Sequence, residues 1–166
     1  MPRHREYVPQ GVIPALLLPF HEDLSIDETT FRAHLRDAAS VDGISAVTIN
    51  AHASEVASCS FDEQKRVLEI AQDEIGASMP IINGVYAEGS LEAARIAKMA
   101  QQGGASALLV FPSGIFTFGQ RPEMAVAHFK RLRFDPNRLV AVLREALQRV
   151  SFAFGCLRER RRHREP

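Results

Sequence analysis

The sequence predicts an α/β fold made of four strand-then-helix units within residues 10–130. Short apolar runs alternate there with amphipathic stretches, at a spacing of roughly 30 residues per unit. The runs are apolar throughout, which is typical of parallel strands that are covered on both faces. Alternating units of this kind form either a doubly wound sheet or a (β/α)8 barrel, and the periodicity does not decide between them. No G-x-G-x-x-G motif follows the first run, so nothing in the sequence supports a dinucleotide-binding fold.

Each unit has recognisable boundaries. The expected strands are apolar runs bounded by Pro, Gly or Asn, at residues 11–19, 44–50, 80–84 and 105–111. The expected helices follow them, at residues 25–41, 60–75, 90–102 and 122–130. Ser25 and Ser60 each precede a glutamate by three residues. In this capping-box spacing the serine oxygen accepts an orphan backbone N–H and the glutamate reaches back. Gly43 is expected just past a helix end, where glycine adopts left-handed backbone angles, and Gly76 is expected to end the second helix.

The composition suits one globular domain and excludes several classes of protein. Of the 166 residues, 46% are hydrophobic and 24% are charged. No apolar run approaches the roughly 18 residues that a membrane span needs, and the N-terminus has no apolar stretch of signal-peptide type. Cys59 and Cys156 are too few for a disulfide framework. We therefore expect a cytoplasmic protein with no membrane partner.

Residues 131–166 differ from the rest of the chain in charge. Residues 1–130 contain 10 Lys and Arg against 16 Asp and Glu, whereas residues 131–166 contain 10 Arg, no Lys and 4 Asp and Glu. This change in residue usage favours a truncated or frame-shifted gene, in which a peptide of different origin follows the four units. Asp135 is an expected helix start, and the apolar positions that then share one helix face are Leu139, Val142, Leu143, Leu147 and Val150.

The end of this segment is basic. We expect residues 131–166 to form an amphipathic helix followed by a basic, partly disordered tail from Arg158. The tail has no interleaved aromatic residues and no binding motif, so we expect no nucleic-acid partner.

Several short motifs occur in a specific order between residues 10 and 130. They are found at residues 11–20, 27–28, 41–44, 55, 61–67, 80–84, 103–110 and 127–130. In order and spacing they resemble the dihydrodipicolinate synthase / N-acetylneuraminate lyase family. The resemblance implies the N-terminal half of a (β/α)8 TIM barrel over residues 10–130, in a family that is usually tetrameric. It also implies class I aldolase or lyase chemistry on pyruvate and related 2-oxo acids, through a Schiff-base lysine on the sixth strand and a tyrosine at the end of the fifth.

The same resemblance indicates where substrate is expected to bind. The family's Gly-Thr-Thr-Gly-Glu loop aligns with residues 51–55, so His52, Ala53 and Ser54 are the expected substrate-binding residues. The two threonines are replaced by His52 and Ala53, which removes one hydroxyl donor and adds an imidazole, while Ser54 offers a replacement hydroxyl. A tyrosine pair of the family aligns near residues 113–114, where this sequence has Ser and Gly. We expect Glu55 to order its loop. We expect no metal, because His52 and Glu55 alone are too few ligands, and we expect no cofactor.

The resemblance ends after Lys130, before the strands that carry the Schiff-base lysine and the strand-five tyrosine. The three lysines of the sequence all fall in expected helices, so no catalytic residue is predicted. Two functions remain open. The chain is either a truncated, inactive relative of these lyases and aldolases, or a non-catalytic half-barrel that acts as an interaction module. In the second case its open sheet edges would lead to self-association or aggregation.

Overall fold

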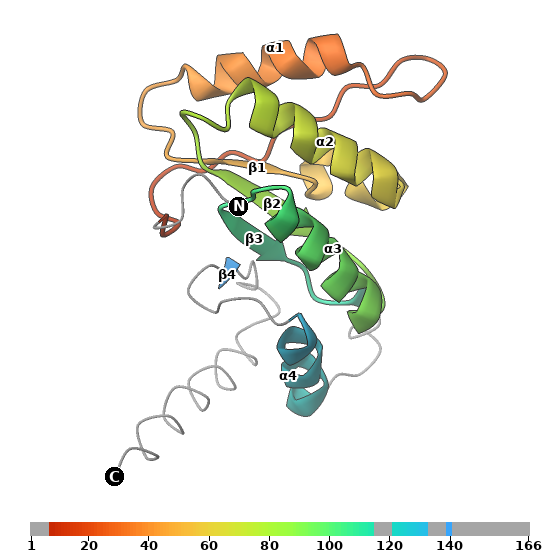
Figure 1. Cartoon of the computed structure of the whole chain (residues 1–166). Helices are drawn as coiled ribbons and strands as arrows, with labels where there is room; N and C mark the ends of the chain where they lie inside the picture. The colour runs from red at the N-terminus through yellow and green to blue at the C-terminus, as the bar shows by residue number, and fades with distance from the viewer. Residues whose placement is uncertain (1–6, 115–120, 133–138, 141–166) are drawn as a thin grey trace.

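The computed structural model describes residues 7–114, 121–132 and 139–140. One parallel sheet has the strand order β1-β2-β3-β4, formed by Val47–Ile49, Ile81–Val85, Ala107–Val110 and Leu139–Val140. The helices that alternate with the strands are α1 (Glu28–Ala39), α2 (Phe61–Glu74), α3 (Ser90–Gln102) and α4 (Pro122–Arg131). Figure 1 shows α1, α2 and α3 side by side, in chain order, along one side of the sheet.

The winding of the sheet distinguishes between the two architectures. Each strand pairs in parallel with the next strand along the chain, for example through Val47 with Ile81 and Ile82 with Ala107. A doubly wound sheet reverses its strand order and carries helices on both faces, whereas a (β/α)8 barrel keeps the sequential order with helices outside. The sequential order therefore confirms the predicted half-barrel fold.

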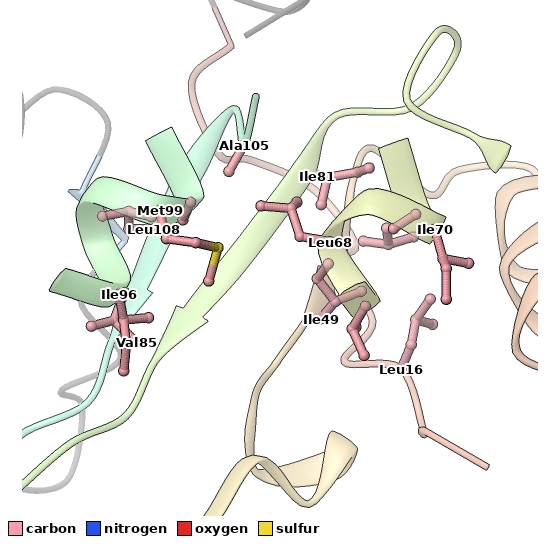
Figure 2. Packing of buried hydrophobic residues seen from close by; sticks show 14 of the residues in the cluster. Leu16, Ile49, Leu68, Ile70, Ile81, Val85, Ile96, Met99, Ala105 and Leu108 are labelled. Atoms are coloured by element: carbon pink, nitrogen blue, oxygen red, sulfur yellow. The ribbon is translucent and has the colours of Figure 1, made fainter. Parts of the chain in front are cut away.

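The two faces of the sheet have different partners, because successive side chains along a strand point to opposite sides. One face packs against the helices, and its strand residues are Val47, Ile49, Ile81, Val85, Leu108 and Val110. Figure 2 shows Leu68 of α2 and Ile96 of α3 among these side chains. The opposite face carries Ala46, Ile82, Ala107, Leu109 and Phe111. Among the described residues no helix contributes to this second cluster, as expected for the inner face of a barrel.

The first expected strand, residues 11–19, lies beside β1 but is interrupted. The Thr48 N–H donates to the Pro14 carbonyl at 2.8 Å, and the Leu16 N–H donates to the Thr48 carbonyl at 2.9 Å. Only isolated bridges form, at Val12 and Ala15. Pro14 has no N–H to donate, which explains why the segment occupies a strand position without a continuous ladder.

The start of α1 differs from the prediction. Asp27, not Ser25, is the N-cap, and its carboxylate accepts a hydrogen bond from the Thr30 N–H at 3.0 Å. The Ser25 hydroxyl instead donates to the Asp23 carboxylate at 2.6 Å. The spacing rule fails here because a second good capping residue lies closer to the helix.

The other helix ends agree with the sequence. At α2 the Glu63 N–H donates to the Ser60 hydroxyl and the Ser60 N–H donates to the Glu63 carboxylate, so the predicted capping box is confirmed. Helix α3 is followed by Gly103 as its C-cap and by Gly104 at φ +91°. Gly43 is also left-handed, at φ +89°, beyond the Ser40 C-cap of α1.

The structure changes the interpretation of residues 139–140. Leu139 and Val140 form β4 and pair in parallel with Leu108 and Leu109 of β3, whereas the sequence predicted a helix there. They take the position of the strand that follows the fourth unit, which was expected to be missing. The free backbone groups at the edge of β3 favour pairing with any extended neighbour, and this overrides the local helical pattern. The remaining predicted helix and the basic tail lie outside the described residues.

Candidate functional site

The loops that follow β1, β2 and β3 emerge at one edge of the sheet, because these strands are parallel. They comprise residues 50–55, 86–89 and 111–114. Ligands of barrel and open α/β proteins bind at this carboxyl edge, where loop side chains are held by a rigid sheet. We therefore take this edge as the candidate site.

Three rings from the three loops meet at this edge. The His52 ring stacks on the Phe111 ring, with 4.1 Å between centroids and 22° between planes. Tyr86 lies edge-on to both rings, at 5.4 Å from His52 and 6.3 Å from Phe111. His52 is exposed, Tyr86 is half-buried and Phe111 is only 8% exposed. The imidazole therefore covers the Phe111 ring and presents its own outer side to solvent.

The three predicted substrate-binding residues lie together in a short 3-10 turn, His52–Ser54. They differ in what they can offer a ligand. Ser54 is buried, and its hydroxyl donates to the Leu16 carbonyl at 2.8 Å, so its hydrogen is committed to the segment beside β1. Ala53 is half-buried and offers only backbone groups. His52 is the exposed polar side chain of the three.

A buried amide holds this loop in place. Asn50 is fully buried at φ +52°, a conformation that asparagine tolerates better than most residues. Its side-chain NH2 group donates to the Gln64 carbonyl of α2 and to the Asn83 side-chain oxygen of β2, both at 2.8 Å. At Gly84 an added Cβ would lie 1.8 Å from the Asn50 carbonyl oxygen. The absence of a side chain at Gly84 therefore lets the loop lean across β2.

Acidic groups border the site. The Ser113 hydroxyl donates to the Glu88 carbonyl at 2.8 Å and to its carboxylate at 3.0 Å, which joins the loops after β2 and β3. Glu55 adopts φ +51° between two 3-10 turns. Its carboxylate bonds to no described residue, so the backbone of Glu55, not its side chain, contributes to loop order.

A cleft of about 420 Å³ adjoins the ring cluster. It lies between the loop after β1 and the first turn of α3, and Tyr86 forms part of its wall. The other lining side chains that bear on its chemistry are Val56, Cys59, Phe61, Glu88, Glu92 and Ile96. The wall is thus mainly apolar with two carboxylates at its rim.

The cysteine in this cleft does not have the setting of a nucleophile. Burial, followed by the nearby charges of Glu63 and Glu55, raises the pKa of the Cys59 thiol. A raised pKa keeps the sulfur protonated and unreactive near neutral pH.

Within residues 7–114, 121–132 and 139–140, no group of three or more His, Cys, Asp or Glu side chains could hold a metal ion. In the same part of the chain, no helix has the length and apolar character needed to cross a bilayer.

A sequentially wound parallel sheet with a loop site at its carboxyl edge defines part of a (β/α)8-barrel protein. The family model for the dihydrodipicolinate synthetase family matches residues 8–131, and the chain belongs to this family. It is therefore a partial member of a family of lyases and aldolases.

The chain is 36% identical to 4-hydroxy-tetrahydrodipicolinate synthase of Agrobacterium fabrum over 101 residues, and 36% identical to that of Haloarcula marismortui over 115 residues.

These matches cover 61% and 68% of this chain but only 34% and 35% of the relatives. The chain thus spans about a third of the length of the curated relatives that it matches. Solved structures agree on the fold. CdNal from Clostridium difficile in complex with mannosamine matches with a TM-score of 0.72 and 25% identity, over 80% of this chain and 46% of CdNal. A putative dihydrodipicolinate synthase family protein from Coccidioides immitis gives a TM-score of 0.73 at 20% identity, over 85% and 45% of the two chains.

Proposed function

We propose that these 166 residues are a catalytically incomplete lyase/aldolase that retains a subsite for a 2-oxo acid. The subsite consists of His52, Ala53 and Ser54 at the carboxyl edge of β1. Schiff-base chemistry requires an amine near the bound keto carbon, in a setting that lowers the pKa of that amine.

The positions of the lysines carry the proposal of inactivity. The sequence has three lysines, Lys65, Lys98 and Lys130. They lie on α2, α3 and α4, and all three are exposed. A barrel nucleophile belongs at the carboxyl end of a strand, inside the ring of helices. An exposed lysine on an outer helix lies away from that position, so it cannot serve as the nucleophile.

Trapping with borohydride tests this proposal. The full chain is incubated with pyruvate and sodium borohydride, and its intact mass is measured. We expect no added mass, because all three lysines are exposed on helices and none lies at the carboxyl end of a strand. The Agrobacterium fabrum relative, treated identically, serves as the control for trapping conditions. A reduced pyruvate adduct on any lysine of this chain would overturn the proposal.

The geometry of the His52–Ser54 turn supports recognition of a carboxylate. The backbone N–H groups of His52 and Ala53 bond to no described carbonyl, and the His52 ring beside them is exposed. Adjacent free N–H groups form a favourable setting for an anion, and an imidazole N–H adds a further donor. Binding of pyruvate, followed by chemical shifts of the His52 and Ala53 amides, tests this part. We expect shifts at these two amides and none at the amides of α1.

The free edge of the sheet favours a second candidate function, a non-catalytic half-barrel that self-associates. Beside β1, Val12 and Leu17 are each 63% exposed. The backbone groups of Ile13 and Ala15 that face away from β1 bond to no described residue. Unpaired edges with apolar side chains invite pairing with another chain.

Light scattering after size exclusion tests this second candidate. We expect a dimer or larger species that Leu17→Lys converts towards monomer, with Leu24→Lys as a matched exposed control away from the edge. A strictly monomeric, folded chain would rule the second candidate out. The cytoplasmic location stays a prediction from the sequence.

A further inference from the structure

We propose that the retained subsite prefers a 2-oxo acid with a flat, uncharged aromatic substituent, and that His52 and Tyr86 set this preference. The inference rests on the proposed 2-oxo acid subsite and specifies its ligand class. It comes from the ring cluster and the cleft beside it.

The ring cluster offers a stacking surface. The rings of Phe111 and His52 are stacked, with 4.1 Å between their centroids. The imidazole is exposed, and no described residue stacks on the side that faces away from Phe111. Aromatic pairs in offset or edge-on contact are favourable beyond the area they bury. A flat ring can therefore extend the existing stack, whereas the methyl group of pyruvate cannot.

The polar edges of the rings are available to a ligand. The interactions of His52 and Tyr86 with other described residues are ring contacts, so within that part of the chain the imidazole nitrogens and the Tyr86 hydroxyl have no hydrogen-bond partner. Half-buried tyrosine hydroxyls normally find a partner. A carboxylate or keto oxygen of the ligand would satisfy both donors while its ring packs on the stack. The recognised molecule is thus polar at one end and aromatic at the other.

The adjoining cleft selects the charge of the ligand. Tyr86 contacts the ring cluster and also lines the cleft of about 420 Å³. Apolar side chains, among them Val56, Phe61 and Ile96, form most of its wall. Glu88 and Glu92 at the rim disfavour a second negative charge on the ligand. A ligand with an uncharged aromatic group is therefore favoured beside this cleft over a ligand with a second carboxylate.

Binding of three probes to the full chain tests the inference. Dissociation constants are measured by ligand-observed NMR titration for pyruvate, phenylpyruvate and 2-oxoglutarate. We expect phenylpyruvate to bind about tenfold more tightly than pyruvate, since one added aromatic contact and its apolar burial have this magnitude. We expect 2-oxoglutarate to bind less tightly than phenylpyruvate, because its second carboxylate meets Glu88 and Glu92.

Variants assign the preference to the rings. In the wild type we expect a ratio of about tenfold between the dissociation constants of pyruvate and phenylpyruvate. His52→Thr and Tyr86→Leu should each reduce this ratio to about threefold or less. His21→Thr, which changes an exposed histidine outside the ring cluster, should leave the ratio unchanged. Circular dichroism confirms that each variant is folded, and Tyr86→Phe serves as the isosteric form if Tyr86→Leu unfolds. Tyr86→Phe should weaken both acids about equally, because it removes a donor but keeps the ring.

The outcomes separate the inference from the proposed function. Equal affinity for pyruvate and phenylpyruvate, or an unchanged ratio in His52→Thr, overturns the aromatic preference while the 2-oxo acid subsite stands. The aromatic preference is also overturned if His21→Thr abolishes the difference in affinity between pyruvate and phenylpyruvate. If no probe binds, both the subsite and its preference fail, whereas the borohydride result on the lysines is unaffected.

Discussion

The rings of His52 and Phe111 stack although their loops follow β1 and β3, two strands that do not pair with each other. The stack therefore spans β2, the strand between them. Gly84 of β2 has no side chain, and the Asn50 carbonyl occupies the place where a Cβ would lie. One glycine in the middle strand thus permits a contact between residues of its two neighbours.

Gly84→Ala is expected to unfold or severely destabilise the chain. The added Cβ would lie 1.8 Å from the Asn50 carbonyl oxygen, and both groups belong to backbone that is fixed by the sheet. Overpacking of this kind costs about 3 kcal/mol or more where nothing flexible can move. Urea denaturation measures the loss in the free energy of unfolding.

Gly89→Ala is the matched control, because nothing lies within 4 Å of a Cβ placed there. Its cost should stay below about 1 kcal/mol, the scale of a change at a helix N-cap. Similar unfolding free energies for the two variants would contradict the close approach at Gly84.

Asn50→Ala is expected to cost about 2–4 kcal/mol, because it leaves the Gln64 carbonyl and the Asn83 side-chain oxygen without a buried donor and also strains a left-handed backbone. Asn50→Gly removes the same hydrogen bonds but relieves the backbone. It should be less destabilising than Asn50→Ala by roughly 1 kcal/mol. Chemical denaturation of both variants measures the difference. If the alanine variant is the more stable one, backbone strain at this position has no role.

The sequence predicted the fold well because the fold depends on repeated patterns. Four apolar runs separated by amphipathic stretches led to the parallel sheet, and the order of the motifs led to the barrel. The errors lie where a local rule had a competitor. Asp27 replaced Ser25 as the N-cap, and Leu139 paired with an available strand edge instead of entering a helix.

The ring cluster was predicted only in part. His52, one of the three expected substrate-binding residues, lies in this cluster, yet Tyr86 and Phe111 were not expected beside it. Each of these two residues directly follows the last residue of its strand. That register is visible in the sequence, and it could have placed all three rings at one edge. The bond from the Ser54 hydroxyl to the Leu16 carbonyl could not be foreseen, because it joins segments whose packing no local pattern specifies.

Ser25 and Ser60, the two serines with capping-box spacing, should differ in how much their mutation lowers the free energy of unfolding. Ser60→Ala should cost about 1 kcal/mol, because it removes the acceptor for the Glu63 N–H at the start of α2. Ser25→Ala should cost less than about 0.5 kcal/mol, since Ser25 is exposed and caps no helix. Thermal and urea unfolding of the two variants give the comparison. Equal losses would mean that Ser25 also supports its helix.

The contact between α3 and α4 includes a buried histidine. The Ser90 hydroxyl and the His128 Nδ1 share a hydrogen bond of 2.9 Å, and His128 is only 2% exposed. Burial lowers the pKa of His128, because the charged imidazolium is poorly solvated between the two helices.

The lowered pKa of His128 predicts that stability falls as the pH falls below the pKa of about 6.5 that the imidazole has in the unfolded chain. Below that pH the unfolded state binds a proton that the folded state excludes, so protonation pulls the equilibrium towards unfolding. Above it the imidazole is neutral in both states and this contribution to stability is fully present. Urea midpoints measured between pH 5.0 and 7.5 should therefore rise with pH, in a range above the ordinary pKa values of Asp and Glu. His128→Gln keeps a side chain that can bond to Ser90 but cannot titrate, so its midpoint should change less over the same range. An equal pH dependence in the wild type and in His128→Gln would show that other histidines, not His128, control the response.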